Sequence, residues 1–237
     1  MLQTASYTDC GGRPYNEDTC IGCTKEKGLC LVVADGLGGH GGGEQASEMA
    51  AQAVCRGWDG GADKDALTRL IRRANEAVLA IQTPSCAMKT TVVALTVEDS
   101  RAVWAHVGDS RLYHFYNGKL VFQTKDHSVA QLGVMLGDIT PDEIRFHPDR
   151  SRVLRALGQE GELKVDAAER KLEKGKHAFL LCSDGFWEYV MEREMEQELS
   201  AASDPADWIE RMRKYLSERI PEDNDNNTAA VAWLEIL

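Results

Sequence analysis

Apolar residues recur along this chain with two different periods. Short apolar runs bounded by turn-forming residues predict strands at about residues 7–23, 28–34, 90–97, 101–107, 112–116, 119–122, 163–168, 178–182 and 228–236. From Gly43 onward apolar residues follow a helical period, which predicts two amphipathic helices. The apolar face of the first consists of Ala46, Met49, Ala50, Ala53 and Val54. The apolar face of the second consists of Leu67, Leu70, Ile71, Ala74, Val78 and Ile81. Another helix is expected to begin at Asp204, followed by a proline in its first turn, and to bury Trp208, Ile209, Met212, Tyr215 and Leu216.

The turns between the strands indicate how the sheets are built. Asn117-Gly118 is a strong two-residue hairpin signal, and Gly108-Asp109-Ser110-Arg111 is a second tight turn. Hairpins join antiparallel strands, whereas the nearly continuous apolar character of these strands requires both sheet faces to be covered. The sequence therefore predicts an α+β fold in which two antiparallel sheets pack together with helices outside. Residues 126–158 are polar and are expected to be irregular, with short helical pieces.

Composition narrows the class of protein. The chain has 237 residues, is 43% apolar and contains no linker-like or repeated segment, so we expect a single domain over residues 1–237. A formal net charge of −11 argues against nucleic-acid and anionic-membrane partners. No apolar run reaches the roughly 18–20 residues of a membrane span, and the first residues lack signal-peptide character. We expect a cytoplasmic monomer.

Cysteine usage fits a reducing compartment, because seven is an odd number in a chain large enough to fold without disulfides. Cys20-Ile-Gly-Cys23 has the spacing of a zinc or redox motif, but no second pair of this kind accompanies it. A role in the core is the favoured interpretation for Cys30 and Cys182, which lie inside apolar runs.

Carboxylates follow the ends of several predicted strands. Apolar runs end at Asp35, Asp109 and Asp184, each beside a glycine, and Asp225 lies just before the final strand. Such residues are individually more often turn formers. Carboxylates that converge repel one another unless hard cations neutralise them, and an oxygen-only donor set suits Mg²⁺ or Mn²⁺ better than zinc.

Two further segments carry candidate binding groups. Arg13 offers a planar fork suited to phosphate oxygens, and the adjacent acids Glu17 and Asp18 follow it closely. The glycine-rich segment 35–43 lets the backbone approach a ligand, so that the Gly36 carbonyl is a candidate metal ligand. The alternative for the segment with Arg13, Glu17 and Asp18 is a solvated loop without a ligand, and the alternative for residues 35–43 is a flexible glycine loop. A nucleotide-binding P-loop is excluded, because no Gly-Lys-Ser/Thr follows.

Taken in order, these motifs resemble the metal-dependent serine/threonine protein phosphatases of type 2C, especially the compact bacterial ones. The resemblance covers essentially the whole chain and includes Thr90-Thr91, Asp126-His127-Ser128, His147-Pro148, residues 152–158 and Ser183-Asp184-Gly185 in addition to the segments above. It implies a four-layer α-β-β-α sandwich with a metal site at one edge of the sheets.

The resemblance also implies roles for individual residues. Asp35 would bridge two metal ions, and Asp184 and Asp225 would complete the first site. The Gly36 carbonyl would serve the second, with Glu17 and Asp18 contributing directly or through water. Asp109 and Asp184 would form a third, weaker site, giving two to three Mg²⁺ or Mn²⁺ ions in all. Arg13 would hold the substrate phosphate, and residues 133–148 would form a flap. A metal-bridging hydroxide would attack phosphoserine or phosphothreonine directly.

The leaving oxygen needs a proton, and its source is open. Relatives that place a histidine after Asp-Gly have a proposed general acid there, but this chain has Leu37. His40 is the substitute candidate, with metal-bound water and a structural role for His40 as alternatives. Lys89 replaces the usual glycine before the paired threonines.

The expected partners are phosphorylated proteins and a cognate serine/threonine kinase acting in trans. An inactive regulatory binding module and a hydrolase of small phosphoesters are the alternative functions.

Overall fold

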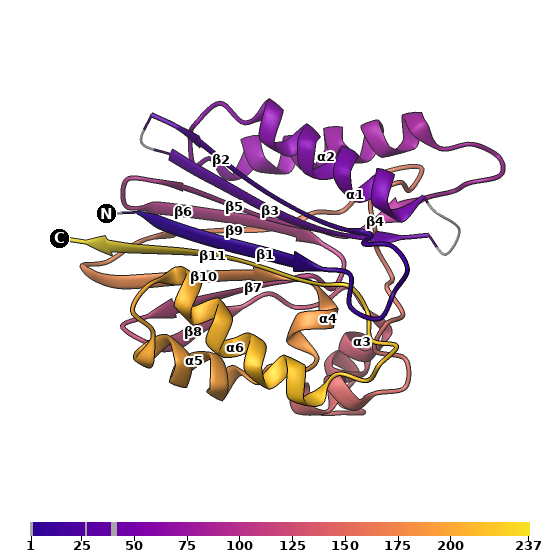
Figure 1. Cartoon of the computed structure of the whole chain (residues 1–237). Coiled ribbons are helices and arrows are strands. Elements are labelled where there is room, and N and C mark those ends of the chain that lie inside the picture. Colours follow the sequence, from indigo (N-terminus) through magenta and orange to yellow (C-terminus); the bar gives the residue numbers. More distant parts are fainter. Residues whose placement is uncertain (1, 27, 39–41) are drawn as a thin grey trace.

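Two antiparallel sheets lie face to face between helical layers in the computed structural model, which describes residues 2–26, 28–38 and 42–237 (Figure 1). The first sheet has the strand order β1-β11-β10-β7-β8, with bounds Gln3–Asp9, Asn227–Ile236, Gly175–Cys182, Arg111–Tyr116 and Lys119–Gln123. The second has the order β2-β3-β5-β6-β9, with bounds Asp18–Lys25, Gly28–Leu37, Val92–Glu98, Arg101–Val107 and Asp166–Lys171. The short strand β4 (Lys89–Thr90) pairs with the end of β3.

Helices cover the outer face of each sheet. The second sheet is covered by α1 (Gly43–Gly57) and α2 (Lys64–Ile81), and the first by α5 (Glu192–Ala201) and α6 (Pro205–Arg219) (Figure 1). Shorter elements lie toward one end of the sandwich: α3 (Val129–Leu136), the 3₁₀ helix η1 (Pro141–Phe146) and α4 (Asp184–Trp187). The predicted four-layer α-β-β-α sandwich is thus confirmed.

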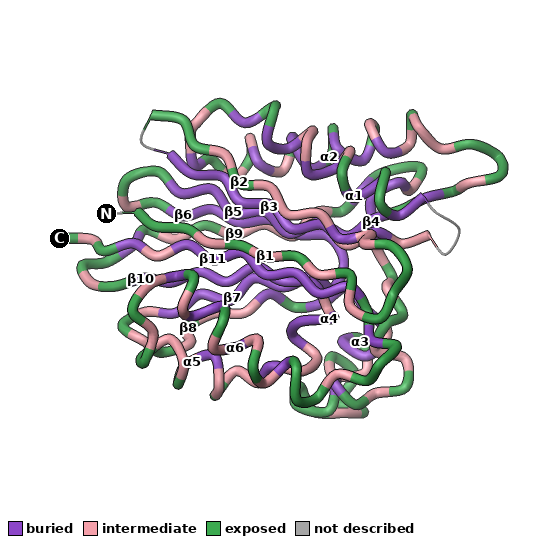
Figure 2. The backbone as a smooth tube through the Cα atoms, in the orientation of Figure 1, coloured by how far each residue is buried: buried purple, intermediate pink, exposed green. Residues whose placement is uncertain are grey.

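Apolar residues fill three layers, one between the sheets and one under each helical pair. Between the sheets, Leu31 and Leu95 of the second sheet share a cluster with Phe179 of the first. The central strands of both sheets are buried along most of their length, whereas the edge strands β1, β8, β2 and β9, the loops and the outer helix faces are more exposed (Figure 2). Burial on both sheet faces explains why the strand sequences show little apolar–polar alternation.

Beside this apolar layer, a chain of hydrogen bonds links Arg170 of β9, in the second sheet, to His114 and His177 of the first sheet. The Arg170 guanidinium donates to His114 Nδ1 (3.3 Å), His114 Nε2 donates to His177 Nδ1 (3.0 Å), and His177 Nε2 donates to the Glu173 carbonyl (2.9 Å). This directionality leaves the His114 ring neutral. Burial, His177 and the Arg170 charge lower the pKa of His114 to about 3.

Connections between the strands differ from the sequence expectation in two places. Gly108 to Ser110 does not close a hairpin but carries the chain from β6 in the second sheet to β7 in the first. Gly108 has a φ of 108°, and a Cβ atom there would lie 2.6 Å from the Thr91 Cβ, so only glycine fits this crossing. Residues 7–23, predicted as one strand-forming stretch, contain parts of two strands, one in each sheet.

Some elements were misplaced or missed. The strand expected at residues 163–168 begins only at Asp166 and runs to Lys171, and helices α4 and α5 were not predicted. Tyr215 is only half-buried on α6. No helix in the described ranges is long and apolar enough to span a membrane.

Candidate metal centre

Asp18 and Asp35 lie directly opposite each other where β2 begins and β3 approaches its end. The Glu17 carbonyl accepts a hydrogen bond from the Gly36 amide (3.0 Å). The Asp35 amide donates to the Thr91 hydroxyl (3.0 Å), and the Thr91 amide donates to the Asp35 carbonyl (2.8 Å). Adjacent segments therefore hold the backbone of both aspartates in place.

Two more carboxylates reach this end of the sandwich from other elements. Asp109 lies in the crossing between β6 and β7, and Asp184 is the first residue of α4, directly after β10. Both follow apolar strands, as the sequence predicted. Ser183 donates to Asp18 Oδ2 (2.7 Å), so the start of α4 is linked to the start of β2.

The electrostatics show that these carboxylates converge. Burial raises the pKa of Asp35 well above its ordinary value, and the charges of Asp18 and Asp184 raise it further. Asp109 and Asp225 act on Asp35 in the same direction. Burial and then the charge of Asp109 likewise raise the pKa of Asp184. The site therefore contains several carboxylates close enough to repel one another.

Two carboxylate oxygens are buried without a hydrogen-bond partner in the described part of the chain, namely Oδ1 of Asp18 and Oδ1 of Asp109. Burial raises the pKa of Asp18 to about 6, although the hydroxyls of Ser183 and Thr228 lower it. Burial and then the charge of Asp126 raise the pKa of Asp109 to about 7. Buried polar atoms normally find partners, and unpaired carboxylate oxygens amid like charges fit hard divalent cations.

The remaining predicted residues form the rim. Arg13 and Asp225 make an ion pair of 3.1 Å, with both side chains about half exposed (53% and 50%). Glu17 Oε1 accepts from the amide of Gly43 at the start of α1 (3.2 Å), and burial raises the pKa of Glu17. Glu17 thus lies beside the aspartates with one oxygen already hydrogen-bonded.

Gly36 is enclosed by backbone. A Cβ atom at this position would lie 2.3 Å from the Gly43 carbonyl group and 2.7 Å from the Glu17 carbonyl oxygen. The glycine therefore lets β3 approach both α1 and the segment before β2. His40, the candidate general acid, lies outside the described residues.

Sequence reasoning missed several supporting residues. The Asn226 side chain accepts from the Glu17 amide (2.7 Å) and donates to the carbonyls of Cys10 and Tyr15 (both 2.9 Å), so it holds the segment that carries Arg13. Glu188 forms a 2.7 Å ion pair with Arg150 and adds negative charge near Asp184. Asn226 lay in a recognised motif without an assigned role, and no pattern marked Glu188.

A buried ion pair and the adjacent Trp187 support the backbone of Asp109. Arg111 binds Asp126 through two hydrogen bonds of 2.8 and 2.7 Å, and its guanidinium lies 3.4 Å above the ring of Trp187. The indole of Trp187 donates to the Asp109 carbonyl (2.9 Å). These contacts fix the backbone of Asp109 through neighbouring elements.

The predicted flap segment, residues 133–148, contains the end of α3 and all of η1. Met135, Leu136 and Phe146 are exposed in this segment (74%, 69% and 74%). It therefore presents apolar side chains on its surface.

This chain belongs to the protein phosphatase 2C family, whose sequence model matches residues 12–235. Over 200 residues it is 34% identical to the serine/threonine phosphatase stp of Listeria innocua, covering 80% of this chain and 79% of that protein. The crystal structure of the serine/threonine phosphatase PstP/Ppp of Mycobacterium tuberculosis matches with a TM-score of 0.86 and 33% identity, covering 99% of both chains.

A further structure, the catalytic domain of PstP in complex with two manganese ions, matches with a TM-score of 0.82 and 30% identity over 98% of this chain and 97% of that one. The likenesses define a serine/threonine protein phosphatase that depends on divalent metal.

Proposed function

We propose that this phosphatase removes phosphate from phosphoserine and phosphothreonine in proteins by direct in-line attack of hydroxide, with no phosphoenzyme, at a centre holding two to three Mg²⁺ or Mn²⁺ ions. The observation that carries the proposal is the convergence of Asp18, Asp35, Asp109 and Asp184 from separate elements, with buried oxygens of two of them unpaired among the residues that the structure describes. The manganese complex of the similar PstP domain supports the choice of metal.

The residues divide into three candidate sites. Asp35 would be shared between two ions, with Asp184 and Asp225 completing one site. The Gly36 carbonyl with Asp18 and Glu17 would serve the second. Because Glu17 Oε1 already accepts from Gly43, its other oxygen or an intervening water would make the contact. Asp109 and Asp184 would hold the third ion.

When bound, the ions would supply the nucleophilic hydroxide and neutralise charge on the phosphoryl oxygens. Arg13 would bind the substrate phosphate through guanidinium donors beyond the one that contacts Asp225, since its half-exposed side chain is accessible. Asp225 would thus orient Arg13 at the rim. His40 remains the proposed proton donor to the leaving seryl or threonyl oxygen.

The biological role follows from the chemistry of the substrate. A phosphoserine or phosphothreonine phosphatase opposes serine/threonine kinases, and we propose a cognate kinase acting in trans. The exposed apolar residues of the flap segment favour a polypeptide over a small phosphoester, because they offer surface beyond the phosphate itself.

The test is Mn²⁺-dependent phosphate release from a phosphothreonine peptide, with Asp35→Asn as the decisive variant. The variant should lose activity and yet melt at a higher temperature than wild type when both are metal-free, because it removes one of several repelling buried charges. Higher stability with lost activity separates a catalytic role from misfolding. Full activity of this variant would contradict the proposed site.

The direct mechanism and the substrate class need separate measurements. A single turnover in isotopically labelled water should place solvent oxygen in the released phosphate, without phosphate remaining on the protein after quenching. Higher kcat/KM for p-nitrophenyl phosphate than for the phosphopeptide would favour the small-phosphoester alternative. No turnover by the metal-loaded protein would favour the inactive module.

A further inference from the structure

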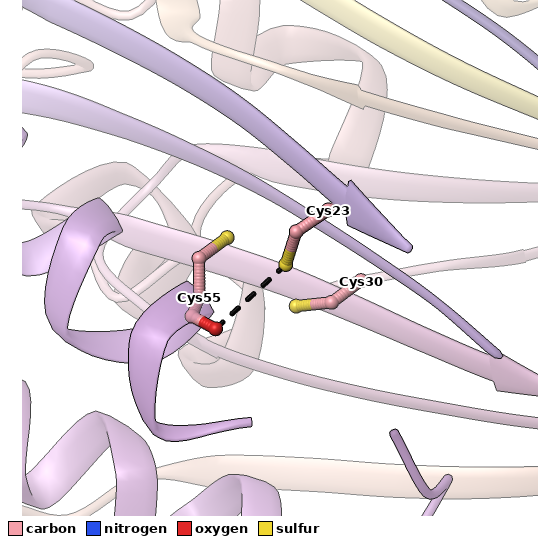
Figure 3. Close-up of side chains that lie close together, drawn as sticks. All are labelled: Cys23, Cys30 and Cys55. Atoms are coloured by element: carbon pink, nitrogen blue, oxygen red, sulfur yellow. Dashed lines mark hydrogen bonds between the residues drawn. The ribbon is translucent and has the colours of Figure 1, made fainter. Parts of the chain in front are cut away.

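Three cysteine side chains meet on the outer face of the second sheet, away from the carboxylate centre. Cys23 of β2 and Cys30 of β3 are paired directly across the two antiparallel strands, and Cys55 approaches from α1 (Figure 3). The three sulfur atoms all lie within 4.8 Å of one another. Segments separated in sequence thus bring three thiols to one point.

The Cys20-Ile-Gly-Cys23 motif does not account for this cluster. Residues three apart on a strand point to opposite faces of the sheet. Cys20 accordingly packs against the apolar layer between the sheets, whereas Cys23 packs under the helices. The partners of Cys23 come from the neighbouring strand and from α1, which no local spacing in the sequence reveals.

The spacing of the sulfur atoms suits a shared metal ion. Three sulfur atoms bonded to one ion at about 2.3 Å lie roughly 4 Å apart in a trigonal arrangement. The observed upper limit of 4.8 Å is therefore within about 1 Å of that geometry, which changes in side-chain torsion angles can supply. Thiolates are soft ligands that select Cu(I) and Zn²⁺ over Mg²⁺ or Mn²⁺.

Burial and charge are also compatible with a bound ion. Cys30 is fully buried and Cys55 nearly so (8% exposed), whereas Cys23 is half-buried and provides access from solvent. The Lys25 ammonium lies near Cys23 and favours the thiolate form of this ligand. Lys25 is held there by a hydrogen bond to the Trp58 carbonyl.

We propose that Cys23, Cys30 and Cys55 form a binding site for a thiophilic d¹⁰ cation, for which three-coordinate Cu(I) is the best match. Within residues 2–26, 28–38 and 42–237 no histidine or carboxylate joins the three sulfur atoms, so this part of the chain offers three ligands. Zn²⁺ prefers four and would have to take a water molecule. Binding forms three sulfur–metal bonds, breaks up to three S–H bonds and releases those protons to solvent.

The test titrates the reduced full-length protein with Cu(I) in competition with a chromophoric Cu(I) chelator, and in parallel with Zn²⁺, always with Mg²⁺ present for the carboxylate centre. Wild type should bind one equivalent of Cu(I), and X-ray absorption should show three sulfur neighbours. Cys23→Ser should bind Cu(I) at least about 100-fold more weakly than wild type. Mutating a residue that only hydrogen-bonds to a metal ligand typically lowers metal affinity about 10–100-fold, and losing a ligand itself should lower it more.

Cys20→Ser and Cys10→Ser are the matched controls and should bind Cu(I) as wild type does. Cys10 is an exposed thiol, and Cys20 shares the motif with Cys23 but faces the other side of β2. Circular dichroism and retained phosphatase activity check that Cys23→Ser is folded, and Cys55→Ser provides a second test from α1.

Three outcomes would overturn the proposal. In the first, Cys23→Ser and Cys55→Ser bind Cu(I) as tightly as wild type does. In the second, Cys20→Ser loses Cu(I) binding instead, and in the third, wild type forms no stoichiometric Cu(I) complex. A Cys23–Cys30 disulfide found by mass spectrometry in a protein that binds no Cu(I) would assign the cluster to thiol oxidation instead. None of these results depends on the assignment of the carboxylate centre.

Discussion

Replacing Asp126 with asparagine should strongly destabilise the protein, although the residue lies outside the proposed metal ligands. Asp126 and Arg111 form an almost completely buried ion pair, with side chains 2% and 4% exposed and two hydrogen bonds of 2.8 and 2.7 Å. The amide oxygen of asparagine can accept one of these bonds. The amide NH₂ group then faces the second guanidinium N–H, so that two donors oppose each other. The guanidinium would then remain buried without its countercharge.

The magnitude follows from the partners that remain. Breaking a buried ion pair by removing one member costs about 3–5 kcal/mol. Glu192 lies 3.9 Å from Arg111 Nη1, and Trp187 lies against the guanidinium, so part of the charge stays compensated. We therefore expect the lower end, about 3 kcal/mol, out of a total unfolding free energy of about 5–15 kcal/mol.

Urea denaturation of the metal-free protein measures this effect. With an m-value of about 3 kcal/mol per molar, the unfolding midpoint of Asp126→Asn should fall by about 1 M. Glu169→Gln is the matched control, because its ion pair with Arg101 is exposed (41% and 50%) and solvent screening leaves it little effect on stability. Equal effects of the two substitutions would refute the argument from burial.

A double variant separates the buried charge from the lost hydrogen bonds. Adding Arg111→Met to Asp126→Asn removes the unpaired guanidinium and keeps an apolar side chain near Trp187. The double variant should be more stable than Asp126→Asn alone, because buried pairs can be replaced by apolar groups at little cost. Further destabilisation would show that the unpaired charge is not the cause.

Three other predictions concern backbone fit, acid stability and the rim. Gly36→Ala should lower the free energy of unfolding by about 1–3 kcal/mol or more and remove most of the activity, because its Cβ atom would lie 2.3 Å from backbone atoms. At Gly38 the nearest atom is 3.2 Å away, so Gly38→Ala should have a smaller effect in the same melting and activity assays. For His114 the folded-state pKa of about 3 lies below the ordinary 6.5, so stability should fall as pH drops below 6.5, by up to about 3 kcal/mol at pH 4. In urea titrations at several pH values, His114→Gln should be less sensitive to acid than wild type. An unchanged pH dependence in this variant would contradict the prediction. Asn226→Ala should raise KM for the phosphopeptide more than it lowers kcat, because it frees the segment before Glu17, and an unchanged KM would exclude that positioning role.

The sequence predicted the positions of most carboxylates because each follows an apolar run. Such a run fixes where a buried strand ends, so Asp35, Asp109 and Asp184 could be placed at strand ends without knowledge of the sheets. Pairing across strands was harder to foresee. That Asp18 lies opposite Asp35 depends on the register of β2 and β3, which local patterns do not specify.

Other features could not be predicted because their partners are distant in sequence or their pattern is weak. In α5, Met195 is the one fully buried residue, so no apolar stripe marks the helix among its many glutamates. The crossing at Gly108 looks like a hairpin turn locally, and only packing against Thr91 shows that it changes sheets. The cysteine cluster depends on strand pairing and helix packing together.

The arrangement of the carboxylates explains how like charges remain together in the fold. Each approaches at a point where the chain leaves or enters a sheet, and none is held there by attraction to the others. Hydrogen bonds from Ser183 to Asp18 and from the Asp35 amide to Thr91, and the indole of Trp187 at Asp109, come instead from the surrounding scaffold. Repulsion between the carboxylates therefore opposes folding of the metal-free protein, while the scaffold keeps their oxygens preorganised. Divalent cations that relieve this repulsion should stabilise the protein and complete the site in the same step.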